Sequence, residues 1–568
     1  MPQNKIRRGI SLIVKKILDL TCLDADHTRK LNEIALNCKR EYTEFVDQYS
    51  KKYGHFYLWW ALPFSSRNIY LDDTFQNICY LKLCRQIILE DSEINHIIVD
   101  NKALYDVLLL NYKQELSKKK ITLENSGRKV IVSGTIIKMF RQFIRQIKVF
   151  FWIKLYLGSQ KYNIEDSISL LDTPLLSSCL ETGKYEDRYF NDIQNYTQKK
   201  VYFLPSLINN SSMNWKEFVN SVKKSRDYRF ILKEKFINLF DYSFVLVYFA
   251  YCLMLATRKY EYGKLDVTPL IRESVLKGSY CVPSIKGVLD ERFIQHLKKT
   301  NIRVENLISW YEGRPSEIML QCAFRKAYPD SRSVGYIGFP YFEFALSEYI
   351  SEEQYNQKAA PLKMTVPGAI YEKQARQFCD KVKLIRVPIL RNRYKKNETE
   401  QAFSKRKILV ILPYFEKYAG RMLHILNEYM RINKENIDII VKNHPVHKGR
   451  TVDWYIKEKL WFVPQYVEGD LVDCLQGKSL AYLSYSSASL EVLSQGIFLV
   501  NLCPGGKLRN TAIPDDIDRR LYRIVYNEKE TFEAFDFCLQ QRSKLVEELS
   551  VADLLEPINE ETVGRLWV

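Results

Sequence analysis

The chain has 568 residues, and its 46% hydrophobic and 27% charged side chains are the balance of a folded globular protein. This composition excludes disordered, collagen-like and coiled-coil chains, and the length predicts more than one domain. Lysine and arginine exceed the acids by 85 to 67, so the net charge of +18 favours phosphate groups or anionic lipid as partners. Nucleic acid is not expected, because the sequence has no zinc spacing, no RNP-type aromatic run and no basic tail.

The first 345 residues contain short apolar runs that are separated by long helical stretches. Such runs predict buried strands, and the helical period at Lys102–Leu110 follows the first of them. We therefore expect one Rossmann-like lobe with helical insertions over residues 1–345. Its predicted strands are His96–Asp100, Val130–Ser133, Val201–Leu204, Leu307–Tyr311 and Ser333–Ile337.

The last part of the chain, from 401 to 568, alternates strand and helix patterns more regularly. A proline-containing linker over 346–400 is expected to join it to the first lobe. The alternation predicts a second Rossmann-like lobe, a parallel sheet covered by helices, and a ligand site in the cleft between the lobes. Its predicted elements are strands at Lys407–Pro413, Ile437–Lys442, Leu480–Ser484 and Ile497–Leu502, and helices at Glu416–Arg431, Val452–Lys459 and Ser487–Gln495.

Several common cofactor and metal signatures are missing from the sequence. It has no G-x-G-x-x-G or Walker A run, which disfavours a dehydrogenase or a kinase. The 12 cysteines include no C-x-x-C pair, which is typical of a reducing cytoplasm. Two Asp-x-Asp triplets, Asp24–Asp26 and Asp516–Asp518, follow no predicted strand. We expect no metal site and no cofactor.

A histidine and a proline follow the predicted strand at Ile437–Lys442. The carboxyl end of a parallel strand faces the ligand crevice, so His444, fixed by Pro445, is placed to donate to a phosphate. Lys442 and Lys448 add positive charge around it. The alternative is an ordinary basic turn with a surface histidine.

Two serines stand between a predicted strand and the next helix. Hydroxyls and free N–H groups at a helix start favour an anion, so Ser486 and Ser487 are candidates for holding a phosphate. Glu491, one turn into the helix, is placed to accept the two hydroxyls of a ribose. The alternative is that Ser487 is an N-cap and Glu491 a residue that compensates the helix dipole.

An acid in the first lobe ends the predicted strand Leu307–Tyr311. Glu312 is followed by Gly313, Arg314 and Pro315, which turn the chain, so its carboxylate is placed in the crevice from the opposite side. There it could accept the proton of an acceptor hydroxyl. The alternative is a Glu312–Arg314 ion pair in a loop.

The ordered set of these motifs resembles bacterial surface-polysaccharide glycosyltransferases of the GT-B type, in particular those that use CMP-activated sialic acid or Kdo. The acidic-Gly, His-Pro and Ser-Ser motifs of that family match Glu312-Gly313, His444-Pro445 and Ser486-Ser487. Tyr311 stands where the first motif usually has another acid. The segments WYEGRPSEIMLQCAFRKAYPDSRSVGY, LPYF, SLEVLSQGIFLVN and YEDRYF are also similar to surface carbohydrate biosynthesis proteins.

The resemblance implies a GT-B fold and the transfer of a nonulosonate or Kdo from its CMP donor to a capsule or O-antigen polysaccharide or its lipid-linked precursor, without a metal. Two alternatives stay open: a CDP-polyol phosphotransferase of the teichoic-acid type, and a catalytically inactive scaffold. The implied roles are general base for Glu312, leaving-group stabilisation for His444, donor-nucleotide binding for Lys442, Pro445, Ser486, Ser487 and Glu491, and phosphate contacts for Arg314 and Lys448.

A basic amphipathic helix is predicted at Ile136–Phe151. Segment 113–154 carries 11 Lys/Arg against 2 acids, and such helices lie in the interface of anionic membranes. We expect a cytoplasmic protein on the inner face of the bacterial membrane, although an internal helix with a charged outer side has the same pattern. The membrane contacts would be Lys138, Arg141, Arg145 and Lys148, with Ile136, Phe140, Phe143, Ile144, Ile147, Phe150 and Phe151 on the opposite side.

Overall fold

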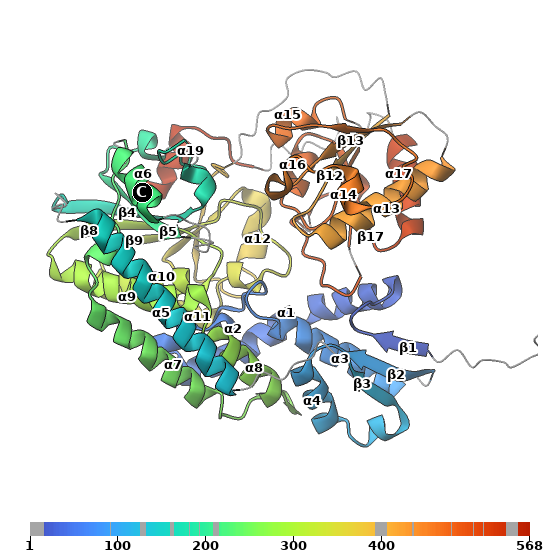
Figure 1. Ribbon diagram of the computed structural model, residues 1–568, viewed down its shortest axis with the longest axis horizontal. Helices are drawn as coiled ribbons and strands as arrows, with labels where there is room; N and C mark the ends of the chain where they lie inside the picture. The colour runs from blue at the N-terminus through green and yellow to red at the C-terminus, as the bar shows by residue number, and fades with distance from the viewer. Residues whose placement is uncertain are drawn as a thin grey trace, which may run out of the picture.

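The computed structural model shows two α/β lobes, each with a parallel sheet, above a helix-rich base (Figure 1). Each lobe is built on its own six-stranded parallel sheet, which confirms the expected α/β class with two Rossmann-like lobes. The structure describes residues 16–90, 93–124, 132–158, 164–180, 182–191, 193–207, 215–225, 227–391, 406–433, 437–478, 480–503, 505–514, 516–540 and 555–568.

The second lobe follows the predicted alternation closely. Its four central strands are mainly apolar and buried, because helices cover the sheet on either side. The sheet order is β14 (Pro464–Tyr466), β13 (Asp438–Lys442), β12 (Lys407–Ile411), β15 (Leu480–Leu483), β16 (Phe498–Leu502) and β17 (Tyr522–Val525). Its helices are α13 (Glu416–Ile432), α14 (Val452–Tyr455), α15 (Leu471–Leu475), α16 (Ala488–Ser494) and α17 (Glu528–Gln540).

The first lobe has a parallel sheet that draws on a longer part of the chain than we predicted. Three predicted runs become β5, β8 and β9, whereas β4, β10 and β11 were not predicted. The order is β11 (Lys383–Arg386), β10 (Lys363–Val366), β9 (Arg332–Tyr336), β8 (Arg303–Trp310), β4 (Ser167–Leu175) and β5 (Val201–Leu207). The helices α6 (Trp215–Lys224), α9 (Val282–Lys299), α10 (Pro315–Ala327), α11 (Glu352–Asn356) and α12 (Glu372–Ala375) accompany it.

Two predicted domain boundaries are therefore corrected. The range 346–400 is not a linker over its whole length, because it supplies β10 and β11 to the sheet of the first lobe. Range 401–568 is not one lobe, because α19 (Glu560–Gly564) returns to the first lobe, as Figure 1 shows in red. There the Arg332 guanidinium donates to the backbone oxygen of Trp567 at 2.8 Å.

The N-terminal part of the chain does not join the first lobe's sheet. The strand predicted at His96–Asp100 is β2 (Ile94–Val99), which pairs with β1 (Lys16–Asp19) and β3 (Lys120–Leu123) in a separate parallel sheet. The base also contains α1 (Ala25–Tyr53), α2 (Pro63–Ser66), α3 (Thr74–Glu90), α4 (Lys102–Asn111), α7 (Ser243–Leu255) and α8 (Thr268–Gly278).

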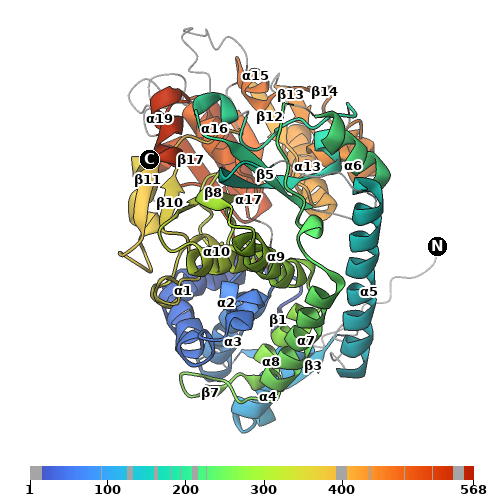
Figure 2. The same ribbon diagram turned by 90° about the vertical axis from the view of Figure 1, so that its left-hand side faces the viewer.

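A long helix, α5 (Val132–Leu157), runs along one side of the molecule from the first lobe to the base (Figure 2). It includes the predicted amphipathic helix. The strand predicted at Val130–Ser133 is wrong from Val132 onward, because α5 begins there, and residues 130–131 lie outside the described part. No helix within the described ranges combines the length and the apolar character needed to cross a bilayer.

Candidate functional site

A cavity of 680 Å³ lies where the two lobes face each other. The first lobe contributes Glu312 and Arg314, which follow β8, and Asp172 from β4. The second lobe contributes Ser487, directly before α16, and the helix α5 contributes Arg145. The structure thus brings together predicted residues that lie 175 positions apart in the chain, at the carboxyl ends of the sheets as expected.

Glu312 is held by two neighbours in the cavity wall. Its Oε1 accepts the indole N–H of Trp310 at 2.8 Å, and its Oε2 forms an ion pair with Arg314. The loop ion pair that we considered as the alternative is therefore present. A carboxylate has about four lone-pair positions, so two stay available for a substrate hydroxyl. Arg314 pairs with Glu312 and lines the same cavity, and its phosphate contact stays a prediction.

The turn after β8 requires a glycine. Gly313 has φ +64°, and a side chain there would place its Cβ 1.9 Å from the backbone oxygen of Ser347. Ser347 also donates its hydroxyl to the Glu312 carbonyl at 2.7 Å. Tyr311, which stands in place of the motif's other acid, is fully buried, and its hydroxyl accepts from Gln354. It therefore contributes no acid to the cavity.

The carboxyl group of Glu317 holds the backbone of the turn that carries Glu312. Glu317, in the first turn of α10, accepts the backbone N–H groups of Glu312 at 2.7 Å and Arg314 at 3.0 Å. Burial is the main cause that raises the pKa of Glu317 to about 8; Arg314 opposes the rise, and the charge of Glu312 adds to it. Glu317 is therefore protonated near neutral pH, while it fixes the backbone that carries Glu312.

Asp172 is a cavity residue that we did not predict. It is almost fully buried at 2% exposure, and it accepts the hydroxyl of Ser206 from the neighbouring strand β5. Burial raises its pKa, and the ammonium group of Lys286, which also lines the cavity, limits the rise. The signal in the sequence was a lone acid in the apolar run ISLLDTPLL, which we did not interpret as a strand.

The serine motif is split between two roles. The hydroxyl of Ser486 accepts the backbone N–H of Ala488 at 3.2 Å, so it caps the start of α16. Ser487 is the N-cap residue by position, but its side chain makes no capping bond, and it lines the interlobe cavity. Glu491 lies in the first turn of α16, half-buried. Our alternative prediction made Ser487 the capping side chain; the structure gives the capping hydrogen bond to Ser486 instead.

His444 lies at the carboxyl end of β13, as predicted, and its hydrogen bonds define its tautomer. Its Nδ1 accepts the backbone N–H of Val446 at 3.3 Å, so the proton resides on Nε2. Burial lowers the pKa of His444, and the nearby charges of His447 and Arg391 lower it further. The ring is therefore neutral at pH 7, with an Nε2–H group that can donate to an anion.

His444 does not line the interlobe cavity. It lines a neighbouring cavity of 420 Å³, together with Lys442, Pro445 and Lys448. There the Lys442 ammonium donates to the Gly469 carbonyl at 2.6 Å, and exposed Lys448 pairs with Glu468 at 3.4 Å. The structure therefore brings the His-Pro residues together but places them beside the cavity of Glu312 and Ser487.

Arg391 connects the two cavities electrostatically. It lines the interlobe cavity, and its charge is close enough to lower the pKa of His444. Its guanidinium lies 5.8 Å from the ring centre of Tyr189, another residue of the cavity wall. The sequence offered no signal for Arg391, because it lies in the range that we expected to be a linker.

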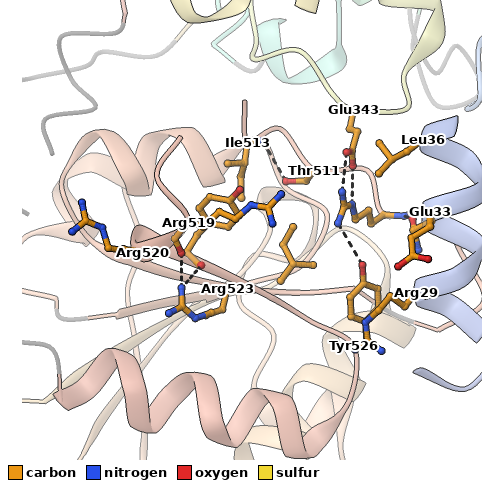
Figure 3. A pocket seen from close by; sticks show the side chains of 14 residues that line it. Arg29, Glu33, Leu36, Glu343, Thr511, Ile513, Arg519, Arg520, Arg523 and Tyr526 are labelled. Atoms are coloured by element: carbon orange, nitrogen blue, oxygen red, sulfur yellow. Dashed lines mark hydrogen bonds and ion pairs between the residues drawn. The ribbon is translucent and has the colours of Figure 1, made fainter. Parts of the chain in front are cut away.

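Another cavity, of 590 Å³, lies between α1 and the second lobe (Figure 3). Arg509 lines it and donates to the Glu343 carboxylate through two hydrogen bonds of 2.8 and 2.9 Å, while Arg29 pairs with Glu530 at 2.7 Å. Arg520 pairs with Asp518 at 2.8 Å. Arg29, Arg509 and Arg520 are thus paired with acids, and the cavity joins the base to the second lobe, with Arg519 and Arg523 also in its wall.

Metal-binding geometry was sought across the part of the chain that the structure describes. No group of three or more His, Cys, Asp and Glu side chains is arranged there to hold an ion. Asp24 caps α1, and Asp518 caps a short 3-10 helix at Arg519–Leu521. Each Asp-x-Asp triplet therefore contains the N-cap residue of a helix.

No protein-family model and no curated protein matches the sequence. Among solved structures, S. aureus MnaA with UDP is 10% identical, covers 71% of this chain and 94% of its own, and has a TM-score of 0.38. The UDP-GlcNAc 2-epimerase of Neisseria meningitidis is 8% identical, with coverages of 70% and 97% and a TM-score of 0.37. A glycosyltransferase of Rickettsia africae is 11% identical, with coverages of 71% and 93% and a TM-score of 0.35.

These similarities are too low to carry an argument about activity. The fold follows from the chain's own topology: two all-parallel sheets, crossovers through helices, and a cavity between their carboxyl ends. The chain thus has the two-lobed architecture of the GT-B type.

Proposed function

We propose that this protein is a glycosyltransferase that moves a sugar from a nucleotide donor to a hydroxyl of a surface polysaccharide or its lipid-linked precursor. The donor that we favour is a CMP-activated nonulosonate or Kdo. One observation carries the proposal: Glu312 from one lobe and Ser487 from the other line the same 680 Å³ cavity. An acceptor base and a phosphate-binding hydroxyl are thereby brought to one space.

The donor's phosphate is assigned to the part of the cavity at Ser487 and Arg391, on the side that faces the neighbouring cavity of His444. Ser487 has a hydroxyl free of capping duty, Arg391 adds a positive charge, and the neutral ring of His444 can donate through Nε2. Departure of the nucleotide develops negative charge on phosphate oxygen, and prearranged donors stabilise that charge by several kcal/mol. These side chains would meet the charge without a metal ion, so activity should survive a chelator.

The remaining residues of the His-Pro and Ser-Ser motifs have supporting roles in this proposal. Lys442 and Lys448 place positive charge beside His444, and Pro445 fixes the turn that orients its ring. Ser486 caps α16 and so positions Ser487. The ribose would be bound by Glu491.

The acceptor's hydroxyl is assigned to Glu312. Its oxygen attacks the anomeric carbon of the donor, its proton passes to the Glu312 carboxylate, and the bond from the anomeric carbon to the phosphate oxygen breaks. The nucleotide leaves with that electron pair. Arg314 pairs with the carboxylate and the Trp310 indole N–H donates to it, so both neighbours orient it towards the cavity.

A thermal-shift screen with CMP, CDP, UMP and UDP tests the donor assignment. Binding to the native state raises the melting temperature, and we expect CMP to give the largest shift. Mass spectrometry of the product with a CMP-sugar donor then tests the reaction. A product with a new phosphodiester bond would indicate the polyol phosphotransferase instead, and the absence of any shift with all four nucleotides would indicate a scaffold.

A further inference from the structure

We propose that α5 and the adjoining start of α7 form a docking surface for an anionic lipid bilayer, and that this surface opens into the interlobe cavity. The surface consists of the outward side of α5 and the short 3-10 helix η6 (Leu239–Tyr242) that precedes α7. The delivery of a lipid-linked acceptor rests on the proposed function. The membrane contact itself does not.

The solvent-facing side of α5 carries large apolar side chains, whereas a helix that packs on a core normally has polar side chains on this side. Ile137, Phe140, Ile144 and Phe151 are each 51–55% exposed, and Leu155 is 66% exposed. Their spacings of three, four and seven residues place them on one side of the helix. We predicted Phe140, Ile144 and Phe151 for an apolar side opposite the cations. They instead share the exposed side, which argues against an internal helix that shows only charge to water.

The apolar surface continues from α5 onto η6, which lies beside it in the fold. The ring of Phe150 on α5 lies 5.3 Å from that of Tyr242, which ends η6. Leu239 and Phe240 in η6 are 52% and 72% exposed. Figures 1 and 2 both show α5 beside α7. Exposed apolar side chains thus gather on two adjacent elements, and such patches mark interaction sites.

Cations lie among these apolar side chains. Lys138, Arg141 and Lys148 on α5 are exposed, and none of them forms an ion pair with any residue that the structure describes. A helix with cations and large apolar side chains on one exposed side fits the boundary between lipid headgroups and acyl chains. An anionic surface would neutralise the charges, whereas a symmetric dimer through this face would bring like charges together.

The cavity reaches this surface through α5. Arg145 and Gln146 line the cavity, as does Val282 at the start of α9. Arg145 is thereby reassigned from the membrane contacts that we predicted to the cavity wall. A lipid-linked acceptor whose lipid stays in the bilayer at Ile144 and Phe151 would extend its polar glycan past Arg145 towards Glu312.

Cosedimentation with lipid vesicles tests the surface without any donor or acceptor. We expect the full chain to bind phosphatidylcholine vesicles that contain about one-third phosphatidylglycerol, and to bind neutral phosphatidylcholine at least about tenfold less. The variant K138Q/R141Q/K148Q should lose about 100-fold in the partition coefficient, since each cation contributes about fivefold. The variant I137S/F140S/I144S should lose at least about tenfold.

Matched variants control for charge and hydrophobicity alone. Lys259→Gln, Lys381→Gln and Lys529→Gln together remove three exposed cations elsewhere, and Val463→Ser removes an exposed apolar side chain of the second lobe. Both controls should bind like the unchanged protein. The proposal would be overturned if both α5 variants still bound the vesicles. It would also be overturned if the unchanged protein were a dimer that I137S/F140S/I144S dissociated and K138Q/R141Q/K148Q did not. Intact vesicle binding with no transfer to a lipid-linked acceptor would count against the proposed function alone.

Discussion

Replacement of Glu312 by Gln tests the base assignment with little change of shape. The amide oxygen of Gln can still accept the Trp310 indole N–H, while the ion pair with Arg314 is lost. Arg314 still lies 4.0 Å from Glu317, which ionises more readily once the charge of Glu312 is removed. We therefore expect a loss of unfolding free energy of at most about 2 kcal/mol.

The effect on turnover should be much larger. General base catalysis contributes about 10²–10⁴ in rate, so Glu312→Gln should lower kcat at least about 10²-fold at saturating donor and leave the donor KM nearly unchanged. Product formation followed by mass spectrometry measures both constants. The surface variant Glu352→Gln, whose partner is exposed Lys381, is the matched control and should behave like the unchanged enzyme.

A variant of Asp172 tests whether this residue, rather than Glu312, is the general base. Asp172→Asn keeps an oxygen that accepts from Ser206, so we expect a loss of less than about tenfold if Asp172 is no base. A loss of 10²-fold or more there, with near-normal turnover of Glu312→Gln, would move the base to Asp172. Because burial raises the pKa of Asp172, kcat/KM would then begin to fall at a pH above the usual range of aspartate.

Three further predictions concern the neighbours of the cavity. His444→Ala should lower kcat at least about 10²-fold with folding intact, as measured by turnover and circular dichroism. Glu317 binds a proton in the folded state up to about pH 8, so unfolding free energy should fall as pH rises from about 4.5 to 8, and urea titrations should show this dependence weakened in Glu317→Gln. Arg509→Met should cost about 2–4 kcal/mol by leaving buried Glu343 unpaired, whereas Arg520→Met, which breaks an exposed pair, should cost less than about 1 kcal/mol in the same titrations.

The second lobe could be predicted from the sequence because its strands and helices alternate at short intervals. Its four central strands are largely apolar runs of four or five residues, and β12, β13 and β15 are each followed by a helix before the next strand. Local patterns therefore placed His444 and Ser487 at the ends of strands. They could not show that Ser486 takes the capping bond and frees Ser487, since that depends on the backbone of Ser487 at the start of α16.

The first lobe was harder because its sheet is assembled from distant segments. Strand β4 pairs with β8 across more than 130 residues of sequence, and helices of the base, α7 and α8, lie between the two strands in the chain. Asp172 and Arg391 reach the cavity only through this assembly, so no local spacing could assign them. Glu312 was predictable because the turn Glu-Gly-Arg-Pro marks a strand end by its own chemistry.

The distance from Glu312 in the first lobe to Ser487 and His444 in the second depends on how the second lobe is held. Segment 505–514 of that lobe is bonded both to the base and to the first lobe: the N–H of Arg509 donates to Asn32 of α1 at 2.5 Å, and the N–H of Glu343 donates to the carbonyl of Thr511 at 2.9 Å. With the Arg509–Glu343 ion pair, this segment fixes the second lobe against both neighbours. If Glu312 of the first lobe and Ser487 and His444 of the second act on one donor and acceptor, loosening this contact should reduce turnover although Arg509 lies in another cavity. A variant Arg509→Met that is destabilised but turns over normally would show that the lobes find their catalytic position without it.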